Sequence, residues 1–185
     1  MSKTKSAGSK PLAIEVLMAD HRKVEDLFVQ YEAAKDADDE SRRDIAAAVC
    51  DELTVHATVE EEIFYPWLRE TLDEDDMEMV EEAQVEHNGA KDLIAQIQDA
   101  SEVDAVFDAK VKVLSEYIKH HVKEEENEIF PSVAGEREAL DELGQEMEAR
   151  KAELKDELGI EGEGKPAASR KPTNGAANSR KGAAR

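Results

Sequence analysis

The sequence predicts an all-α protein, an up-down-up-down four-helix bundle of two duplicated helical hairpins with an extra C-terminal helix. Helix-breaking residues are rare, because the 185 residues include only 9 Gly and 5 Pro, and aromatic residues make up 4%. Apolar residues recur at steps of three and four in four long segments, as in helices that bury one face. Short polar links join these segments, so consecutive helices should run antiparallel.

The first hairpin is predicted to begin at Pro11, a residue that suits the first turn of a helix. The apolar stripe that follows reaches Tyr31. A polar link at residues 36–40 precedes the second helix, which should start near Ser41. We expect this helix to end at about Pro66, because a proline ring blocks the ordinary helical hydrogen bond.

The second hairpin is predicted to repeat the first. Acidic residues at positions 73–76 suit the amino end of the third helix. Ser101 and Asp104 resemble a capping box that opens the fourth helix, which should end near Pro131. Residues 136–158 are rich in Glu, Ala, Leu and Lys, and we expect a fifth helix there that packs loosely or is partly frayed.

Charge divides the chain into a central body and two basic tails. Residues 1–10 hold three Lys and residues 165–185 hold six basic residues, with no acidic residue in either segment. Between positions 11 and 164, 15 basic residues stand against 45 acidic ones, a net charge of −30. We expect flexible basic tails at residues 1–10 and 161–185. The four-helix bundle is then assigned to residues 11–134 and the additional helix to residues 135–160.

The acidic body should repel nucleic acid and anionic membrane surfaces. No apolar run approaches the ~20 residues needed to cross a bilayer, and no hydrophobic stretch follows the basic amino end. We therefore expect a cytoplasmic protein without nucleic-acid or membrane partners, while the sequence names no protein partner for the basic tail. Cys50 is the single cysteine, which excludes an internal disulfide, and we expect it in the core.

One motif occurs twice in the chain. HATVEEEIFYP spans residues 56–66 and HVKEEENEIFP spans residues 121–131, and each places Glu four residues after His and Pro six residues after that Glu. A step of four residues turns a helix by only ~40°, so both polar side chains face inward with the apolar stripe. One such His–Glu pair has little weight in a chain with 45 acidic residues, but matched copies on matched stripes favour a shared role.

Two further histidines interrupt the apolar stripes of the first and third helices at nearly the same interval. Six polar residues should therefore meet inside the bundle: His21, His56, Glu60, His87, His121 and Glu125. Buried carboxylates would repel each other and take up protons unless a cation neutralised them. Two metal ions would relieve this cost, and nitrogen and oxygen ligands suit iron, manganese or zinc. Hydrogen-bonded core histidines and glutamates without metal are the alternative.

The two motifs resemble those of the hemerythrin-like proteins, also called the HHE cation-binding domain family, over about residues 11–133. The resemblance implies a non-heme diiron centre with two iron ions as the cofactor, ahead of manganese or zinc. By this likeness the four inward histidines would be terminal iron ligands, and Glu60 and Glu125 would be bridges. Oxygen-carrying members have another His four residues after the third-helix ligand. Lys91 occupies that position here, which puts simple reversible oxygen carriage in doubt.

Other residues lie near the predicted ligands. Glu25, one turn after His21, is expected in solvent or in a salt bridge, with metal ligation as the alternative. His120 lies ~100° round the helix from its neighbour His121, so we expect it beside or behind the ligands. The three tyrosines Tyr31, Tyr65 and Tyr117 are expected in the core or at its rim.

The expected function is to bind a small ligand (oxygen, nitric oxide or peroxide) or iron itself, as a sensor, scavenger or store. One alternative is a diiron enzyme that turns over peroxide or reduces oxygen, and another is a structural acidic bundle without metal. A ferritin-like site is disfavoured, because no His has Glu three residues before it. A zinc protease is disfavoured because no His is followed by another His four residues later.

Overall fold

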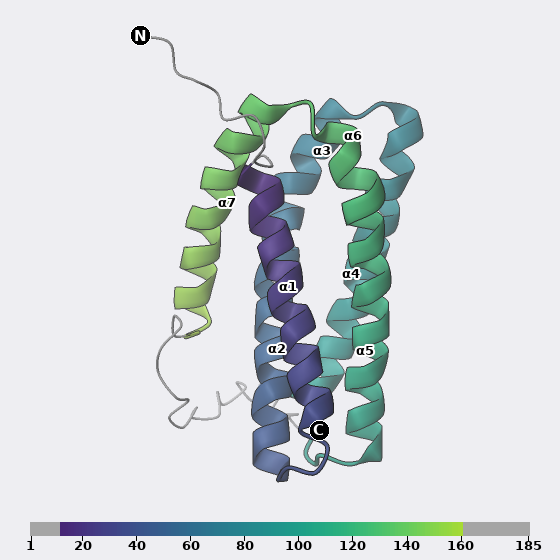
Figure 1. Ribbon diagram of the computed structural model, residues 1–185, viewed down its shortest axis with the longest axis vertical. Coiled ribbons are helices and arrows are strands. Elements are labelled where there is room, and N and C mark those ends of the chain that lie inside the picture. The colour runs from purple at the N-terminus through teal and green to yellow at the C-terminus, as the bar shows by residue number, and fades with distance from the viewer. Residues whose placement is uncertain (1–11, 161–185) are drawn as a thin grey trace, which may run out of the picture.

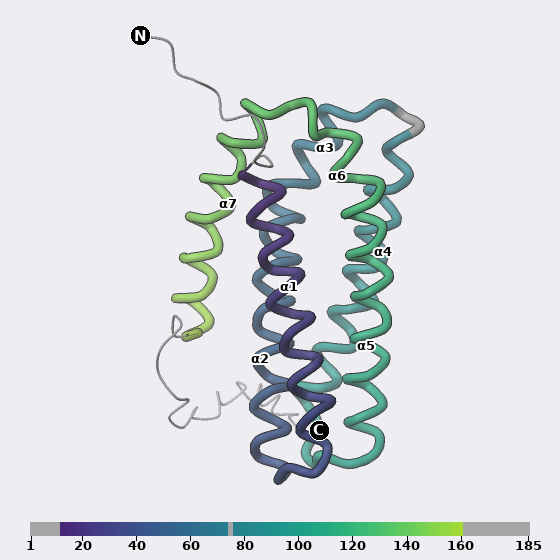
Figure 2. Tube along the Cα trace, in the orientation of Figure 1, coloured from purple at the N-terminus to yellow at the C-terminus, as the bar shows by residue number. Residues whose placement is uncertain are grey.

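A computed structural model of the chain describes residues 12–160, apart from the side chains of residues 74 and 75. Four long helices stand side by side and a fifth lies along one flank (Figures 1 and 2), which confirms the predicted all-α bundle. Pro11 and the predicted tails at residues 1–10 and 161–185 lie outside the described residues. Within residues 12–160, none of the helices has both the length and the apolar character that crossing a membrane requires.

The first hairpin consists of α1 (Leu12–Ala33) and α2 (Asp39–Val59). Asp38 caps α2, because its carboxylate accepts a hydrogen bond of 2.9 Å from the backbone N–H of Ser41. Beyond α2 the chain continues through the π-helical segment η1 (Glu60–Phe64) into α3 (Tyr65–Thr71). These three segments form one long rod that runs antiparallel to α1 (Figure 1).

The second hairpin consists of α4 (Glu74–Gln98) and α5 (Ala105–Glu124), followed by η2 (Glu125–Ile129) and α6 (Phe130–Val133). Asp104 is the N-cap of α5, and its carboxylate accepts from the backbone N–H groups of Val106 and Phe107 at 3.0 and 2.8 Å. The prediction that Ser101 opens this helix is therefore wrong. An aspartate cap holds two N–H groups at once and needs no partner three residues earlier.

The predicted end of the second helix at Pro66 is also wrong, because the rod continues to Thr71. In η1 the backbone hydrogen bond spans five residues, from the N–H of Tyr65 to the carbonyl of Glu60. Pro66 then falls in the first turn of α3, where a missing N–H costs little. The same five-residue bond precedes Pro131, from the N–H of Phe130 to the carbonyl of Glu125. Both π-helical segments therefore begin at the glutamates of the repeated motif.

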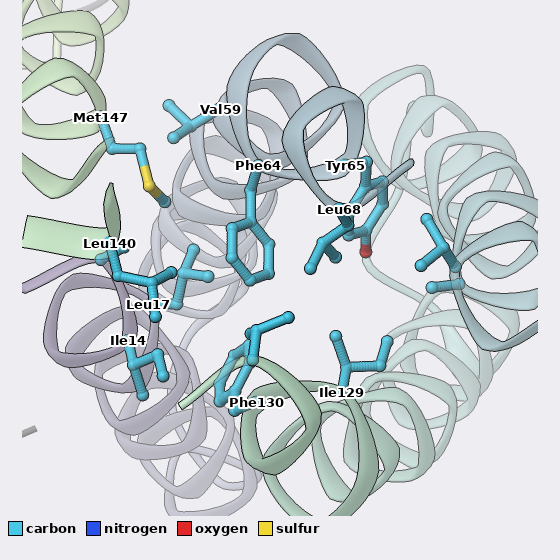
Figure 3. Close-up of a cluster of buried hydrophobic side chains, with 14 of the residues drawn as sticks. Ile14, Leu17, Val59, Phe64, Tyr65, Leu68, Ile129, Phe130, Leu140 and Met147 are labelled. Carbon is cyan, nitrogen blue, oxygen red and sulfur yellow. The ribbon is translucent and has the colours of Figure 1, made fainter. Parts of the chain in front are cut away.

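Two apolar clusters make up the core. One lies at the α3, α6 and α7 end and includes Phe64, Leu68 and Phe130, which face one another between the helices (Figure 3). The other fills the opposite half and includes Phe107 and Cys50, which is fully buried as predicted. The histidines of the four long helices lie where one cluster gives way to the other. A polar layer thus separates two apolar ones.

The fifth helix, α7 (Arg137–Glu157), packs against α1 and α2. Leu140 and Met147 are fully buried and Leu154 nearly so, which shows that the expectation of loose packing is wrong. These three residues recur every seven positions and form a narrow apolar seam. Such a seam suits a helix that lies along the groove between two others, even though most of its surface is charged.

Gly144 of α7 permits close contact with the start of α1. A Cβ atom at this position would lie 2.5 Å from the backbone nitrogen of Ala13 and 2.7 Å from the carbonyl carbon of Leu12. Both neighbours are backbone atoms, which cannot rotate away. The glycine therefore fixes how near α7 approaches the bundle.

We expect Gly144→Ala to lower the free energy of unfolding by about 1–3 kcal/mol, because the new methyl group overpacks this contact. Helix propensity alone would make the alanine variant more stable by about 1 kcal/mol, so a loss of stability would indicate the close contact. Urea denaturation measures it. Gly135→Ala is the control, since a Cβ there meets nothing within 4 Å. A more stable Gly144→Ala variant would contradict the close approach.

Candidate metal centre

The structure brings all six predicted polar residues together in the middle of the bundle. The helices α1, α2, α4 and α5 and the two π-helical segments each supply one side chain: His21 from α1, His56 from α2, Glu60 from η1, His87 from α4, His121 from α5 and Glu125 from η2. None of the six is more than 4% exposed. The helical period of the stripes accounts for this convergence, because each residue lies on the buried face of its helix.

Glu60 lies between the two hairpins. Its Oε2 atom is 3.2 Å from Nε2 of His56 in the first hairpin and 3.3 Å from Nε2 of His87 in the second. Nε2 of His87 is in turn 3.1 Å from Nε2 of His121. These ring nitrogens therefore point at a shared carboxylate and not at the apolar clusters.

Glu125 has the equivalent position on the other side of the centre. Its Oε2 atom is 3.2 Å from Nε2 of His21 and 3.5 Å from Nε2 of His121, again one histidine from each hairpin. The potential ligand atoms fall into two overlapping sets, which share Glu60. One set contains His21, His56, Glu60 and Glu125, and the other contains Glu60, His87 and His121. The arrangement suits two cations with a carboxylate between them.

The outward nitrogen of each histidine faces a second carboxylate. Nδ1 of His21 is 2.9 Å from Oε1 of Glu126, and Nδ1 of His87 is 3.1 Å from Oε1 of Glu61. Each of these carboxylates directly follows the inward glutamate of its own motif and reaches a histidine of the opposite hairpin. A carboxylate on Nδ1 orients the ring and leaves Nε2 free to bind a cation.

The other two carboxylates come from the residues that precede His21 and His87. Nδ1 of His121 is 2.7 Å from Oε2 of Glu86, and Nδ1 of His56 is 3.6 Å from Oδ2 of Asp20. Sequence reasoning missed all four outward carboxylates. The sequence nevertheless holds a pattern that could have identified them. An acidic residue directly precedes both His21 and His87, and an acidic residue directly follows the inward glutamate of each motif.

A cationic side chain stands behind three of these carboxylates. Nη2 of Arg22 lies 2.5 Å from Glu126, Nζ of Lys91 lies 2.5 Å from Glu61, and Nζ of Lys151 lies 2.5 Å from Asp20. Lys91, at the position of the expected additional histidine, is therefore turned to Glu61.

The fourth outward carboxylate, Glu86, has a histidine behind it. His120 is exposed, and its Nε2 atom lies 3.7 Å from Glu86 and 3.1 Å from Glu124. This places it behind the predicted ligand His121. Glu25 lies at the surface and accepts a hydrogen bond from Arg22, so it has the salt-bridged position.

Burial and mutual repulsion govern the electrostatics of the centre. Burial, together with the charge of Glu125, raises the pKa of Glu60 well above its ordinary value. Burial opposes ionisation of Glu125 as well, but the positive charge of His121 and the ring of His21, whose Nε2 lies 3.2 Å from Oε2, hold its pKa below the usual range. Burial and the neighbouring His121 lower the pKa of His87 to about 3. The two glutamates thus have opposite tendencies at neutral pH.

Tyr65 is fully buried, and its hydroxyl group belongs to the centre. The hydroxyl donates to Oε1 of Glu125 at 3.1 Å and lies 3.3 Å from Nε2 of His87. Burial, with the negative charges of Glu125 and Glu60, raises the pKa of Tyr65 well above its ordinary value, so the phenol keeps its proton. Phe130 occupies the matching place in the second motif. This difference between the two copies was the feature of the sequence that could have indicated a role for the Tyr65 hydroxyl.

A small cavity of about 20 Å³ adjoins the centre on the side of the second apolar cluster. All four inward histidines reach its wall, and the remaining lining is mainly aliphatic: Val24, Leu53, Ala57, Ala90, Ile94, Ile118 and Val122. A cavity of 10–15 Å³ on this measure holds one water molecule, so there is room for a diatomic molecule.

Comparisons with known proteins agree with this architecture. The family described as hemerythrin HHE cation binding domain matches residues 12–133. The crystal structure of a hemerythrin HHE cation binding domain-containing protein from Mycobacterium kansasii superposes with a TM-score of 0.66 at 21% identity, over 81% of this chain and 90% of that one.

A curated protein named DNA nickase, from Nostoc sp., is 28% identical over 147 residues. These residues are 78% of this chain and 40% of the nickase, so the chain spans less than half of that relative's length. The structural likeness is a likeness of fold. The family match covers both hairpins and all six predicted ligands, and the chain therefore belongs to the hemerythrin HHE cation binding domain family.

Proposed function

We propose that the chain is a non-heme diiron protein that binds a small ligand, namely oxygen, nitric oxide or peroxide, as a sensor or scavenger. The observation that carries the proposal is the convergence of four imidazole Nε2 atoms and two carboxylates on one buried point beside an apolar cavity. Storage of iron is a related role of the same centre. A metal-free structural bundle is less favoured, because it gives no reason to bury these groups together.

Unpartnered polar atoms support the presence of cations. Nε2 of His21 and of His56, both carboxylate oxygens of Glu60 and Oε2 of Glu125 are buried without a hydrogen-bond partner. A buried polar atom without a partner costs about 1–3 kcal/mol, so five of them at one point would be a large penalty. Cations at this point would supply the missing partners, and the residues therefore fit the dinuclear site that the family implies.

The potential ligands can be divided between two metal positions. His21 and His56 would hold one iron ion, His87 and His121 would hold the other, and Glu60 and Glu125 would lie between them. Nitrogen and carboxylate donors suit iron, with manganese or zinc as lesser candidates. When bound, an iron pair supplies two redox-active ions with positions open to a small molecule. The protein contributes orientation of the rings through the outward carboxylates and exclusion of bulk water.

Tyr65 and the apolar cavity favour a small ligand. The cavity can take a diatomic molecule but no larger organic substrate. The protonated hydroxyl of Tyr65 can donate a hydrogen bond beside His87 and Glu125. Since Lys91 is engaged with Glu61, no fifth histidine fills the place that it has in oxygen carriers. Reversible oxygen carriage is therefore the least favoured of the ligand-binding roles.

Turnover of peroxide or reduction of oxygen is the second candidate, since the same Tyr65 hydroxyl can donate a hydrogen bond to a ligand within the centre. Nicking of DNA is not proposed, although one relative has that name. The net charge of −30 between positions 11 and 164 opposes contact with a phosphate backbone. That relative is also more than twice the length of the matched segment.

Purified protein should contain about two iron ions per chain and show near-ultraviolet charge-transfer absorption of a ferric pair. His56→Ala and Glu125→Ala should each reduce the iron content below one ion per chain, because each removes a ligand of a shared centre. Elemental analysis and an aerobic absorption spectrum measure both effects. Full iron retention in both variants would refute the ligand assignment. Sustained oxygen release after addition of hydrogen peroxide would favour the enzyme over the binding protein.

Glu60→Gln should separate cation binding from stability. The metal-free variant should be more stable than wild type by roughly 1–3 kcal/mol near pH 8, because a buried charge is removed. The pKa of Glu60 is raised above 4.5, so the gain should shrink as the pH falls toward that value and wild type becomes protonated. Iron or zinc should raise the unfolding midpoint of wild type and should no longer raise that of the variant.

Glu52→Gln is the matched control for this experiment. Glu52 is a buried glutamate of α2 that pairs with Lys23 at 3.0 Å and Lys155 at 3.1 Å. Its neutralisation should lower the stability of the metal-free protein and leave the response to cations unchanged. A stabilising Glu60→Gln variant that still responds fully to cations would show that Glu60 is not a ligand.

Ala90→Leu should fill the apolar cavity beside the centre. We expect binding of nitric oxide or azide to slow by about tenfold or more, because a blocked cavity leaves the ligand no space, while the iron content stays near two per chain. Stopped-flow absorption measures the rate. Ala46→Leu is the control, since Ala46 is a buried alanine of the same apolar cluster that is not among the residues lining the cavity. Equal slowing in both variants would argue against the apolar cavity as the ligand site.

A further inference from the structure

The helix that lies outside the family match reaches the candidate centre. The match ends at residue 133, and α7 begins at Arg137. From α7, the ammonium group of Lys151 lies 2.5 Å from Oδ1 of Asp20, and both side chains are largely buried. The other oxygen of Asp20 faces Nδ1 of His56. One chain of polar groups therefore runs from α7 through α1 to a predicted ligand on α2.

We propose that Lys151 is a positioning residue of the metal centre, which holds Asp20 so that its free oxygen orients the ring of His56. The proposal rests on the proposed metal-binding function and adds a role for α7 in setting cation affinity. Lys151 would act through Asp20 and His56 and would not touch a cation itself. The helix appended to the bundle would thus be part of the site.

The geometry of the other three histidines supports this role. Each has a carboxylate on Nδ1, and the groups behind those carboxylates, Arg22, Lys91 and His120, all belong to the two hairpins. Asp20 is the exception among the four outward carboxylates, because the side chain paired with it, Lys151, comes from α7. The second hairpin has no counterpart of this lysine, since Glu86 has the exposed His120 in the matching place. Lys151 thus completes for His56 an arrangement that the bundle builds for the other three from its own helices.

The contact between Asp20 and His56 explains why the lysine is needed. Oδ2 of Asp20 and Nδ1 of His56 are 3.6 Å apart, and both atoms are buried without a hydrogen-bond partner. A closer approach by about half an ångström would give a hydrogen bond of ordinary length. Lys151 holds Asp20 in place from the other side, because its ammonium group lies 2.5 Å from Oδ1. At that shorter distance the Asp20 carboxylate would accept from Nδ1 of His56, which would leave Nε2 of that ring free to bind a cation.

Lys155 provides a matched control one helical turn further along α7. It also pairs with a buried acid, Glu52, at 3.1 Å, and it is similarly shielded from solvent. Nδ1 and Nε2 of the four inward histidines contact other carboxylates, and Glu52 is not among them. Lys151→Met and Lys155→Met therefore remove the same kind of ion pair from the same helix, and one of the two pairs leads to a ligand.

The test compares full-length wild type, Lys151→Met, Lys155→Met and Lys151→Arg. Competition with a chromophoric chelator measures zinc and ferrous iron affinity, and urea denaturation of the metal-free proteins measures structural damage. We expect Lys151→Met to lower the affinity of the weaker-bound cation by about 10–100-fold, as for other residues behind metal-binding histidines. Lys155→Met should change it by less than about threefold, and Lys151→Arg should restore most of the affinity. Lys151→Met should lose more stability than Lys155→Met, because Glu52 keeps its ion pair with Lys23.

Nitrogen NMR of the metal-free proteins gives a readout that does not need a cation. His56 should carry its proton on Nδ1 in wild type and in Lys155→Met, and should lose this preference in Lys151→Met. If wild type binds no cation, the proposed function fails, and the tautomer of His56 still decides the role of Lys151. Equal losses of affinity in the two methionine variants, or an unchanged His56 tautomer in Lys151→Met, would overturn the proposal.

Discussion

The placement of six polar side chains in the middle of an apolar bundle is the constraint on which the rest of the structure depends. Imidazoles and carboxylates at this depth are tolerated only when every polar atom has a partner. Three outward nitrogens find theirs in Glu61, Glu86 and Glu126, while that of His56 faces Asp20 at 3.6 Å. The inward atoms converge on one another, and this arrangement is stable when positive charge lies between them. The apolar clusters above and below keep water from serving as the substitute.

The internal duplication explains how one chain assembles so many groups at one level. Glu61 of the first hairpin holds a histidine of the second, and Glu126 of the second holds a histidine of the first. Asp20 and Glu86 each hold the other histidine of their own hairpin. The two halves are therefore interlocked, and neither hairpin alone has a complete set of partners. Tyr65 and Phe130 mark where the halves differ, since one supplies a hydroxyl group and the other a bare ring.

Much of this organisation is predictable from the sequence, because helical periodicity determines which residues share a buried face. His21 and His87 stand out since they interrupt rows of Leu, Val and Ile, and the repeated motif places Glu60 and Glu125 beside them. The extension beyond Pro66 is not predictable in this way. It depends on a shift from four-residue to five-residue backbone hydrogen bonds, and the packing around the segment determines whether that shift occurs.

The contact of Lys151 with Asp20 was equally out of reach, because it joins residues 131 positions apart and leaves no periodic trace in either helix. The loose packing expected of α7 failed for a related reason. Its charged composition suggested weak burial, but Gly144 and a narrow seam of large aliphatic residues let it sit closely on α1. Tertiary contacts of this kind depend on shape, which composition does not report.

Each inward glutamate lies between histidines of both hairpins. A metal ion bound at the centre would therefore form a reversible cross-link between the two hairpins. A metal ion held there would join segments of both hairpins that are far apart in the sequence, such as those of His21 and Glu125, and would stabilise the folded chain, because the unfolded chain offers no preformed site. Unlike a disulfide, such a link is lost when the supply of metal falls. The rigidity of the bundle would therefore follow the iron status of its surroundings.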